Sequence, residues 1–230
     1  MKANSVNAWL LRCRPSGDTS IRTSFFTNEY GIVEALYKGG RTPKKKSVLQ
    51  PFMSLWLELN IRQDWHFVQK VEADSPVLPL LGHCLFAGLY VNELLYSMLK
   101  PNDPVPALFE TYQKTLHGLT QVGDRLSIEP VLRRFERMLL EVSGYAISFT
   151  HEAHNGEEIN EGGVYCFVAG AGFYLSKEGY SGHDLLAFSK DNLDNSETLK
   201  TIKTVMRQAI AHALDGKKIQ TRKLYSSVRS

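Results

Sequence analysis

The chain has 230 residues, of which 43% are hydrophobic and 22% charged, with a formal net charge of +3. This composition is that of a globular protein large enough for one large or two small domains. It contains no apolar run long enough for a membrane helix and no N-terminal segment of secretory type, so we expect a cytoplasmic protein that does not enter a membrane.

The first seventy residues carry the pattern of short β-strands, because segments rich in β-branched and aromatic residues alternate with turn signals. The expected strands span residues 6–13, 19–27, 31–38, 52–61 and 65–71. Within 52–61, Met53, Leu55, Leu57 and Leu59 alternate with Ser54, Trp56 and Glu58. Five such strands without a long helix between them predict a small antiparallel barrel. Three aromatic residues are expected in its core: Phe26, Trp65 and Phe67.

Helical periodicity follows the proline-containing segment 72–79, which predicts a boundary between a domain over 1–75 and a helical domain over 76–230. The expected helices span 80–100, 107–122, 127–145, 184–190 and 196–216. In 127–145, Pro130 suits a first helical turn and Gly144 a C-terminal stop. The apolar stripe of this helix consists of Val131, Leu132, Phe135, Leu139 and Val142. The Gly-rich stretch 151–183 predicts an irregular insertion with short strands near 164–169 and 172–176.

The stretch "YKGGRTPKKKSVLQPF", residues 37–52, is strongly basic and has no acidic residue. Its five cations are Lys38, Arg41, Lys44, Lys45 and Lys46. Residues 1–70 hold eleven Lys and Arg against five Asp and Glu, which gives this part a local net charge of +6. Such a segment can neutralise phosphates of a nucleic acid. The alternative is a solvated loop that serves solubility alone.

Trp56 lies out of phase with the aliphatic residues of its strand, where a nucleic-acid base could stack on it. The alternative is that Trp56 packs against a neighbouring strand or the helical part.

Arginines border the apolar stripe of the helix over 127–145. Arg133 and Arg137 share a face, and Arg134 lies beside it. Guanidinium groups next to apolar side chains suit an acidic peptide with an apolar end. The alternative is that these arginines pair with Glu129, Glu136 and Glu141 along the same helix.

Signals for catalysis or for a cofactor are weak. His151 and His154 lie three residues apart, without further ligands at a recognised spacing. Cys13, Cys84 and Cys166 lie far apart, which argues against a disulfide framework and a Cys-x-x-Cys metal knuckle. No phosphate-binding loop of the Walker type and no nucleophile motif occurs. We therefore expect no enzyme, no cofactor and no metal.

Four ordered blocks between about residues 9 and 150 resemble the bacterial DNA repair protein RecO family. The first, "LRCRPSGDTSIRTSFFTNEYGIVEALYKGGR", is similar to the opening hallmark of the family. The other three are "LQPFMSLWLEL", "GLYVNELLYSML" and "LRRFERMLLEVSGY". Many members carry a four-cysteine zinc knuckle after the last block. Here "YAISFTHEAHNGEEIN" has no cysteine, so the chain resembles the zinc-free branch.

The resemblance implies an α+β protein with an N-terminal five-stranded OB-fold followed by a helical domain. It implies a recombination mediator, associated with the nucleoid, that binds single- and double-stranded DNA and anneals complementary strands. Such proteins act with RecR, and often RecF, to load RecA on DNA coated by single-stranded-DNA-binding protein, whose acidic C-terminal tail they contact. For DNA we expect Arg14, Arg22, Lys38, Arg41, Lys44, Lys45, Lys46 and Trp56. For the tail we expect Arg133, Arg134 and Arg137, with Phe109, Tyr112 and Leu132 as groove walls.

Two other classes stay open from the sequence. One is an RNA-binding barrel module with a helical partner domain, which competition between RNA and DNA would reveal. The other is an interaction scaffold whose basic face meets acidic proteins and no nucleic acid.

Overall fold

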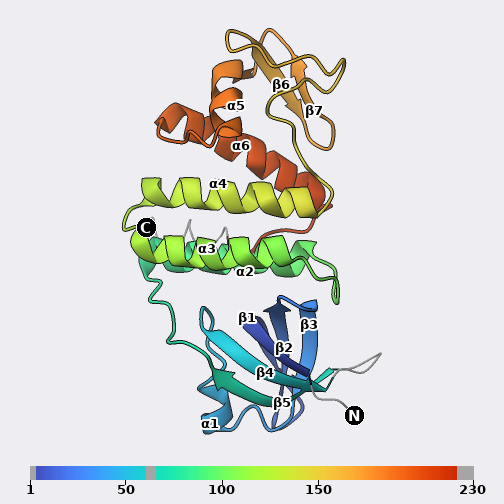
Figure 1. Ribbon diagram of the computed structural model, residues 1–230, viewed down its shortest axis with the longest axis vertical. Helices are drawn as coiled ribbons and strands as arrows, with labels where there is room; N and C mark the ends of the chain where they lie inside the picture. Colours follow the sequence, from blue (N-terminus) through green and yellow to red (C-terminus); the bar gives the residue numbers. More distant parts are fainter. Residues whose placement is uncertain (1–3, 61–65, 222–230) are drawn as a thin grey trace. The chain divides into compact units, whose positions relative to one another are not determined.

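The computed structural model of the chain describes residues 4–60 and 66–221. Two compact units make up the chain: Met1–Gly123 with Ile219–Ser230, and Asp124–Lys218 (Figure 1). The boundary expected after residue 75 lies inside the first unit, between the last barrel strand and the first long helix. The division into domains at that position stays a prediction.

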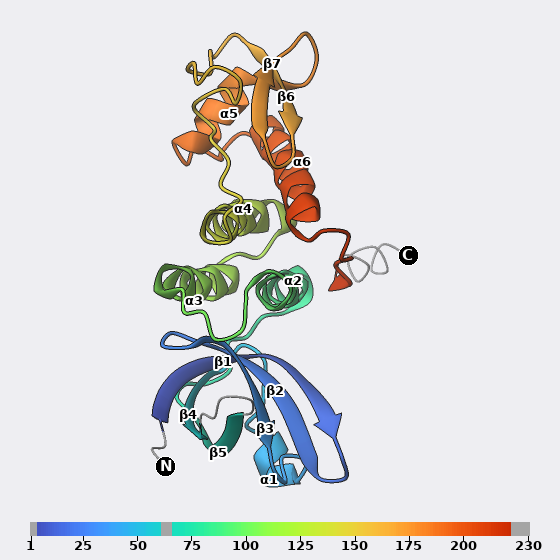
Figure 2. The same cartoon turned by 90° about the vertical axis from the view of Figure 1, so that its right-hand side faces the viewer.

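Five strands of the first unit close into a barrel in the order β1-β2-β3-β5-β4 (Figure 2). They are β1 (Asn4–Ser16), β2 (Ser20–Thr27), β3 (Gly31–Tyr37), β4 (Ser54–Asn60) and β5 (His66–Ala73). The predicted barrel is thus confirmed, although one of its strand pairs, β3 with β5, is parallel rather than antiparallel. In the closed order, β4 pairs with β1 on one side and with β5 on the other. The free edges of β5 and β3 then meet, and their pairing closes the barrel.

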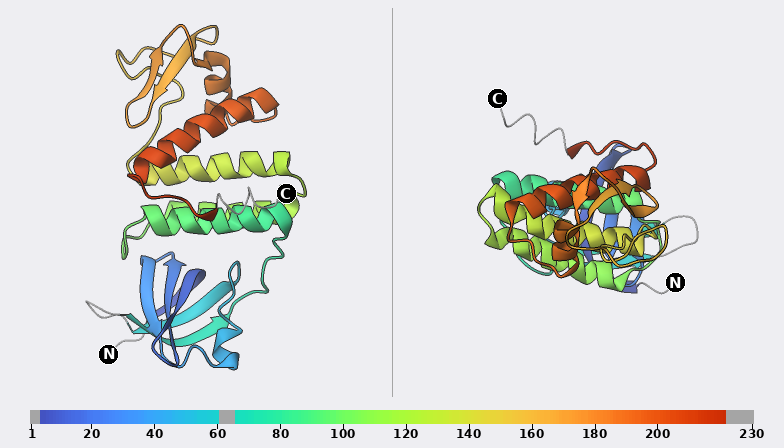
Figure 3. Two further views of the ribbon diagram at one scale, coloured as in Figure 1. Left: turned by 180° about the vertical axis from the view of Figure 1, so that it is seen from behind. Right: turned by 90° about the horizontal axis from the view of Figure 1, so that it is seen from above.

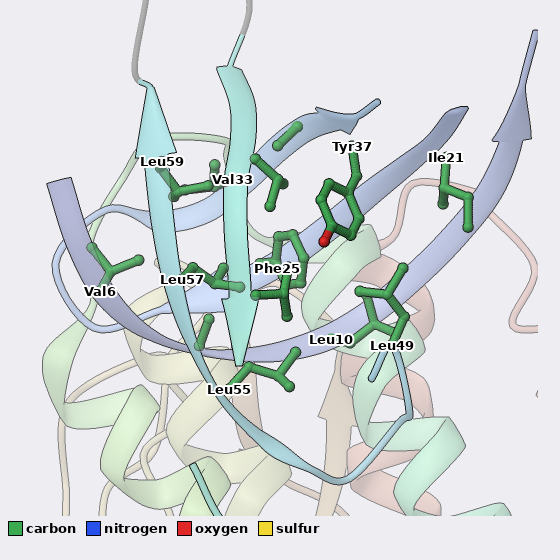
Figure 4. Packing of buried hydrophobic residues seen from close by; sticks show 14 residues of the cluster. Val6, Leu10, Ile21, Phe25, Val33, Tyr37, Leu49, Leu55, Leu57 and Leu59 are labelled. Carbon is green, nitrogen blue, oxygen red and sulfur yellow. The ribbon is translucent and has the colours of Figure 1, made fainter. Parts of the chain in front are cut away.

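The barrel core follows the alternation of its strands. Leu55, Leu57 and Leu59 are fully buried in this core (Figure 4). Trp56 alternates with them and is half-buried on the outward phase of β4. Phe26 is buried as expected, but it packs against a helix rather than inside the barrel. Phe67 is half-buried next to the buried His66 and Val68, so its expected core position is wrong: it falls on the outward phase of β5. Trp65 lies outside the described residues.

A short helix, α1 (Pro43–Lys46), lies in the basic stretch where the sequence predicted a loop. Proline at the first helical position has a fixed φ that suits the turn, and the turn is closed by hydrogen bonds from the Lys46 N–H to Thr42 O (2.9 Å) and from the Ser47 N–H to Pro43 O (3.0 Å).

Two helices complete the first unit, α2 (Gly82–Met98) and α3 (Pro106–Gln121), close to their predicted bounds. The segment between them pairs with the barrel, since the Asn102 N–H donates to Ile32 O at 2.9 Å. Gly31 allows this approach: it has φ of +64°, and a Cβ there would lie 2.1 Å from Asp103 O.

Glu93 of α2 binds the chain at residues 220 and 221, where it returns to the first unit. Its carboxylate accepts hydrogen bonds from the N–H groups of Gln220 (2.7 Å) and Thr221 (2.8 Å) and from the Thr221 hydroxyl (2.7 Å). Glu93 belongs to the "NELL" sequence block, which thus has a structural role in this chain.

The second unit consists of three helices and a small sheet. Its helices α4 and α6 lie against each other (Figure 3). The helices are α4 (Arg125–Val142), α5 (Gly182–Ser189) and α6 (Ser196–Ala213). The sheet has the order β7-β6-β8, with β6 (Val164–Val168), β7 (Gly172–Leu175) and β8 (Tyr180–Ser181). Both expected strands of the Gly-rich stretch are therefore present.

The start of α4 differs from the prediction, while its end agrees with it. Asp124 caps the helix by accepting from the N–H groups of Leu126 and Ser127, so Pro130 lies inside the helix rather than in its first turn. Hydrogen bonds from the Ser127 hydroxyl and these N–H groups hold the pKa of Asp124 below its ordinary value. At the other end Gly144 has φ of +82°, and the Tyr145 N–H donates to Leu140 O at 2.8 Å, which forms a Schellman motif.

Among the helices of the described residues, none combines the length and the apolar character needed to cross a membrane.

Candidate nucleic-acid interface

The basic residues 38–46 lie at one end of the barrel, directly after β3. Lys38, Arg41, Lys44 and Lys46 are exposed, and Lys45 is half-buried. The structure thus brings together the five predicted cations on one short segment, but it gives them different contacts.

Arg41 faces the turn between β1 and β2. Its Nη1 donates to the carbonyl oxygens of Gly17 (3.2 Å) and Asp18 (2.9 Å), and its backbone N–H donates to Thr19 O at 2.9 Å. Arg41 therefore links the basic segment to a turn more than twenty residues earlier in the sequence.

Lys45 folds back onto the segment that precedes it. Its Nζ donates to Lys38 O at 2.9 Å and lies 4.7 Å from the centroid of the Tyr37 ring. Such a contact of an ammonium group with an aromatic face is attractive. Lys45 therefore stabilises the turn, whereas Lys44 and Lys46 on the same helical turn are exposed.

Lys38 lies over Phe67 of β5, with 5.3 Å between Nζ and the ring centroid. Phe67 was expected in the core from its residue type, but it is half-buried and forms this contact. The alternation of β5, in which His66 and Val68 are buried on either side, is the signal that would have indicated it.

Arg14 and Arg22 are exposed and lie directly opposite each other on β1 and β2. Like charges at opposed positions of an antiparallel pair repel each other. Two guanidinium groups side by side near the end of a hairpin suit an anion, because each presents several N–H donors in a fixed plane.

Trp56 lies on the outer surface of β4, opposite Asn7 of β1 and Glu72 of β5. Lys70 Nζ lies 5.4 Å from its ring centroid and forms an ion pair with Glu72 at 2.8 Å. Trp56 thus has a half-buried ring with a cation over it.

The arginines of α4 differ in exposure. Arg133 is 3% exposed, with Nη2 2.8 Å from Glu136 Oε1 and Nη1 3.7 Å from Glu129 Oε2. Lys203 of α6 also pairs with Glu129. For Arg133 the pairing that the sequence left as the alternative is therefore present.

Arg134 and Arg137 are exposed on the same helix. The Nε of Arg134 is 2.7 Å from Asp191 Oδ1, and the guanidinium of Arg137 lies 5.5 Å from the centroid of Phe188. Within the second unit, Arg137 thus contacts the last turn of α5 and Arg134 contacts the residue Asp191 that follows this helix.

The three expected groove walls are buried. Phe109 and Tyr112 belong to the first unit, where Phe109 packs on Phe26 and Tyr112 packs on Trp9 and Phe26, while Leu132 is 6% exposed in the second unit. Phe109 and Tyr112 are therefore covered by contacts within the first unit, and Leu132 is buried in the second. Their role as walls stays a prediction and would require these contacts to open.

No group of three or more His, Cys, Asp or Glu side chains with the geometry of a metal site occurs within residues 4–60 and 66–221. His151 and His154 are both exposed, and the Nδ1 of His151 lies 2.9 Å from the Thr150 hydroxyl.

A closed five-stranded barrel with this strand order is OB-like, and barrels of this class bind oligonucleotides and oligosaccharides on their strands and loops. The comparison with protein families then identifies the chain. Residues 1–76 match the family model "Recombination protein O N terminal", and residues 82–223 match "Recombination protein O C terminal".

Relatives over nearly the full length agree with these matches. The chain is 49% identical over 227 residues to the DNA repair protein RecO of Legionella pneumophila subsp. pneumophila. This match covers 98% of this chain and 99% of that protein. It is 35% identical to the DNA repair protein RecO of Psychromonas ingrahamii, over 99% of this chain and 100% of the relative. The chain therefore belongs to the RecO family of DNA repair and recombination proteins.

Proposed function

We propose that the chain binds single- and double-stranded DNA on its barrel and anneals complementary strands. The observation that carries the proposal is the concentration of exposed cations at one end of an OB-like barrel. Arg14 and Arg22 stand opposite each other on the hairpin, and Lys44 and Lys46 lie on the segment that Arg41 ties to the hairpin turn. Lys38, Lys45 and Trp56 complete the proposed DNA surface.

Annealing follows from charge neutralisation. Two DNA strands repel each other through their phosphates, and a basic surface that binds both lowers this repulsion where the strands meet. This mechanism needs no bond to be made or broken, so we propose a mediator rather than an enzyme.

The partners we propose are those of a recombination mediator. The chain would act with RecR and RecF to help load RecA on single-stranded DNA that is coated by single-stranded-DNA-binding protein. DNA binding would place it at the nucleoid.

A strand-annealing measurement tests the proposal. Mixing two complementary oligonucleotides with a fluorophore and a quencher should give faster quenching in the presence of the protein. Binding to single strands through three to five phosphates should give a slope of log K against log salt of roughly −2 to −3.5. If the protein does not accelerate quenching, the annealing proposal fails. If it also binds an RNA of the same length as tightly as DNA, the RNA-binding module is supported instead.

We also propose that the second unit binds the acidic tail of single-stranded-DNA-binding protein, at Arg134 and Arg137. Both residues are exposed at the surface of the unit, where Arg134 also pairs with Asp191, whereas Arg133 is buried and paired with Glu136. Replacing both by alanine should weaken binding of a fluorescent tail peptide by about tenfold or more, because a hydrogen bond to a charged group contributes about 1.5–3 kcal/mol.

The Arg207→Ala, Lys217→Ala double variant is the charge-matched control, since both are exposed cations of the same unit. Equal tail affinity for the Arg134→Ala, Arg137→Ala protein and the control would exclude this part of the proposal.

A further inference from the structure

Arg41 has unusual contacts for a residue in a charge run. A guanidinium group that binds phosphate directs its N–H donors outward, but Nη1 of Arg41 bridges two carbonyl oxygens of the turn at Gly17 and Asp18. These carbonyl groups lie beyond the last strand pair, Ser16 with Ser20, where the sheet ladder supplies no N–H partner, so Arg41 adds a link that the ladder does not provide.

The neighbouring Gly40 brings the two segments into contact. It is buried, and a Cβ at this position would lie 3.0 Å from Tyr37 O and 3.3 Å from the Cβ of Ile21. The backbone at residues 40 and 41 therefore packs directly on the start of β2, next to Arg22. The backbone bond from Arg41 N–H to Thr19 O adds to this contact.

Two groups of cations depend on this junction. One group, Arg14 and Arg22, lies on the hairpin, and the other, Lys44 and Lys46, lies on α1, three and five residues after Arg41. The pairing of β2 with β3 brings the hairpin close to the end of β3, as far as Ile21 opposite Tyr37. Beyond this pair, the contacts of Gly40 and Arg41 fix the turn to the segment that leads into α1.

We infer that Arg41 is a positioning residue: it fixes the hairpin turn to α1 so that both cation groups present one continuous surface to a nucleic-acid backbone. This inference rests on the proposed DNA binding and assigns a different role to one of its residues. Lys44 and Lys46 bind phosphate, while Arg41 sets the geometry in which they and the hairpin arginines act together.

The salt dependence of DNA binding separates the two roles. For single strands, each lost phosphate contact lowers the slope of log K against log salt by about 0.7. Lys44→Gln should show this change. Arg41→Gln should weaken binding of a single-stranded oligonucleotide several-fold with the slope unchanged, and Arg41→Lys should recover part of the affinity by donating to the same carbonyls.

Hydrogen exchange of the DNA-free protein gives a readout that does not depend on DNA. Arg41→Gln should raise the exchange of the residue-41 amide several-fold, because its N–H donates to Thr19 O at the junction that the side-chain bonds hold closed, whereas Lys44→Gln should leave it unchanged. Unchanged exchange in Arg41→Gln, or a slope that falls by as much as in Lys44→Gln, would overturn the inference. Wild-type protein that binds no DNA would overturn the proposed function, with the exchange result still testing the contact of Arg41.

Discussion

Neutralising the exposed cations of the hairpin and α1 is expected to lower the affinity for single-stranded DNA by about two to three orders of magnitude at roughly 0.1 M salt. The variant replaces Arg14, Arg22, Lys44 and Lys46 by glutamine. Each cation that neutralises a phosphate releases condensed counterions, so four contacts together should reduce the slope of log K against log salt by roughly 3. Fluorescence anisotropy of a labelled oligonucleotide between about 50 and 200 mM salt measures both quantities.

A charge-matched control separates the site from the net charge of the protein. Lys177, Lys190, Arg207 and Lys217 are exposed residues of the second unit, and exchanging these four for glutamine changes the net charge by the same amount. The control should keep most of the affinity and slope. A similar loss in both variants would show a diffuse electrostatic attraction in place of a defined surface on the barrel.

Strand and helix patterns predicted the elements well because their causes are local. The alternation around Trp56 placed three leucines in the barrel core, and the Gly144 stop of α4 depends only on the φ angle that glycine allows. The start of α4 was predicted too late, because Pro130 was assigned to the first helical turn. In the structure the side chain of Asp124 caps the helix, which therefore begins at residue 125.

The docking of helices could not be predicted in the same way. Periodicity shows that α3 has an apolar face, but it does not say that Phe109 and Tyr112 on this face meet Phe26 and Trp9 of the barrel. The same limit explains Arg133, which borders an apolar stripe in the sequence and is buried with Glu136 in the structure. These contacts depend on partners outside the local sequence window.

The basic segment over residues 38–46 has one property that the sequence predicts and one that it does not. The charge run over residues 38–46 was visible in the sequence, and four of its five cations are exposed, while Lys45 is half-buried. The distinct contacts of Arg41 and Lys45 could not be predicted, since one depends on a turn more than twenty residues away and the other on a helical turn where a loop was expected.

Replacing Tyr112 by alanine is expected to lower the free energy of unfolding of the first unit by about 3–5 kcal/mol, the range for deleting a large buried aromatic side chain. Tyr112 is fully buried, and its ring centroid lies 5.7 Å from the ring centroid of Trp9 and 5.7 Å from that of Phe26. Its hydroxyl donates to Asn92 Oδ1 at 2.7 Å, and burial raises the pKa of Tyr112 far above its ordinary value, so this proton donor persists at all ordinary pH values. Urea unfolding followed by circular dichroism measures the loss.

Two further variants separate packing from hydrogen bonding and from peptide recognition. Tyr112→Phe keeps the ring but leaves the buried Asn92 Oδ1 without its donor, so it should cost about 1–3 kcal/mol. Tyr96→Ala removes a tyrosine of α2 that is 37% exposed and should cost less than about 1 kcal/mol.

If Tyr112 instead formed the wall of a peptide groove, Tyr112→Ala would weaken tail-peptide binding with little change in stability. The burial of the ring against Trp9 and Phe26 favours the opposite result, because a side chain without exposed surface contributes to binding only through the fold that it stabilises.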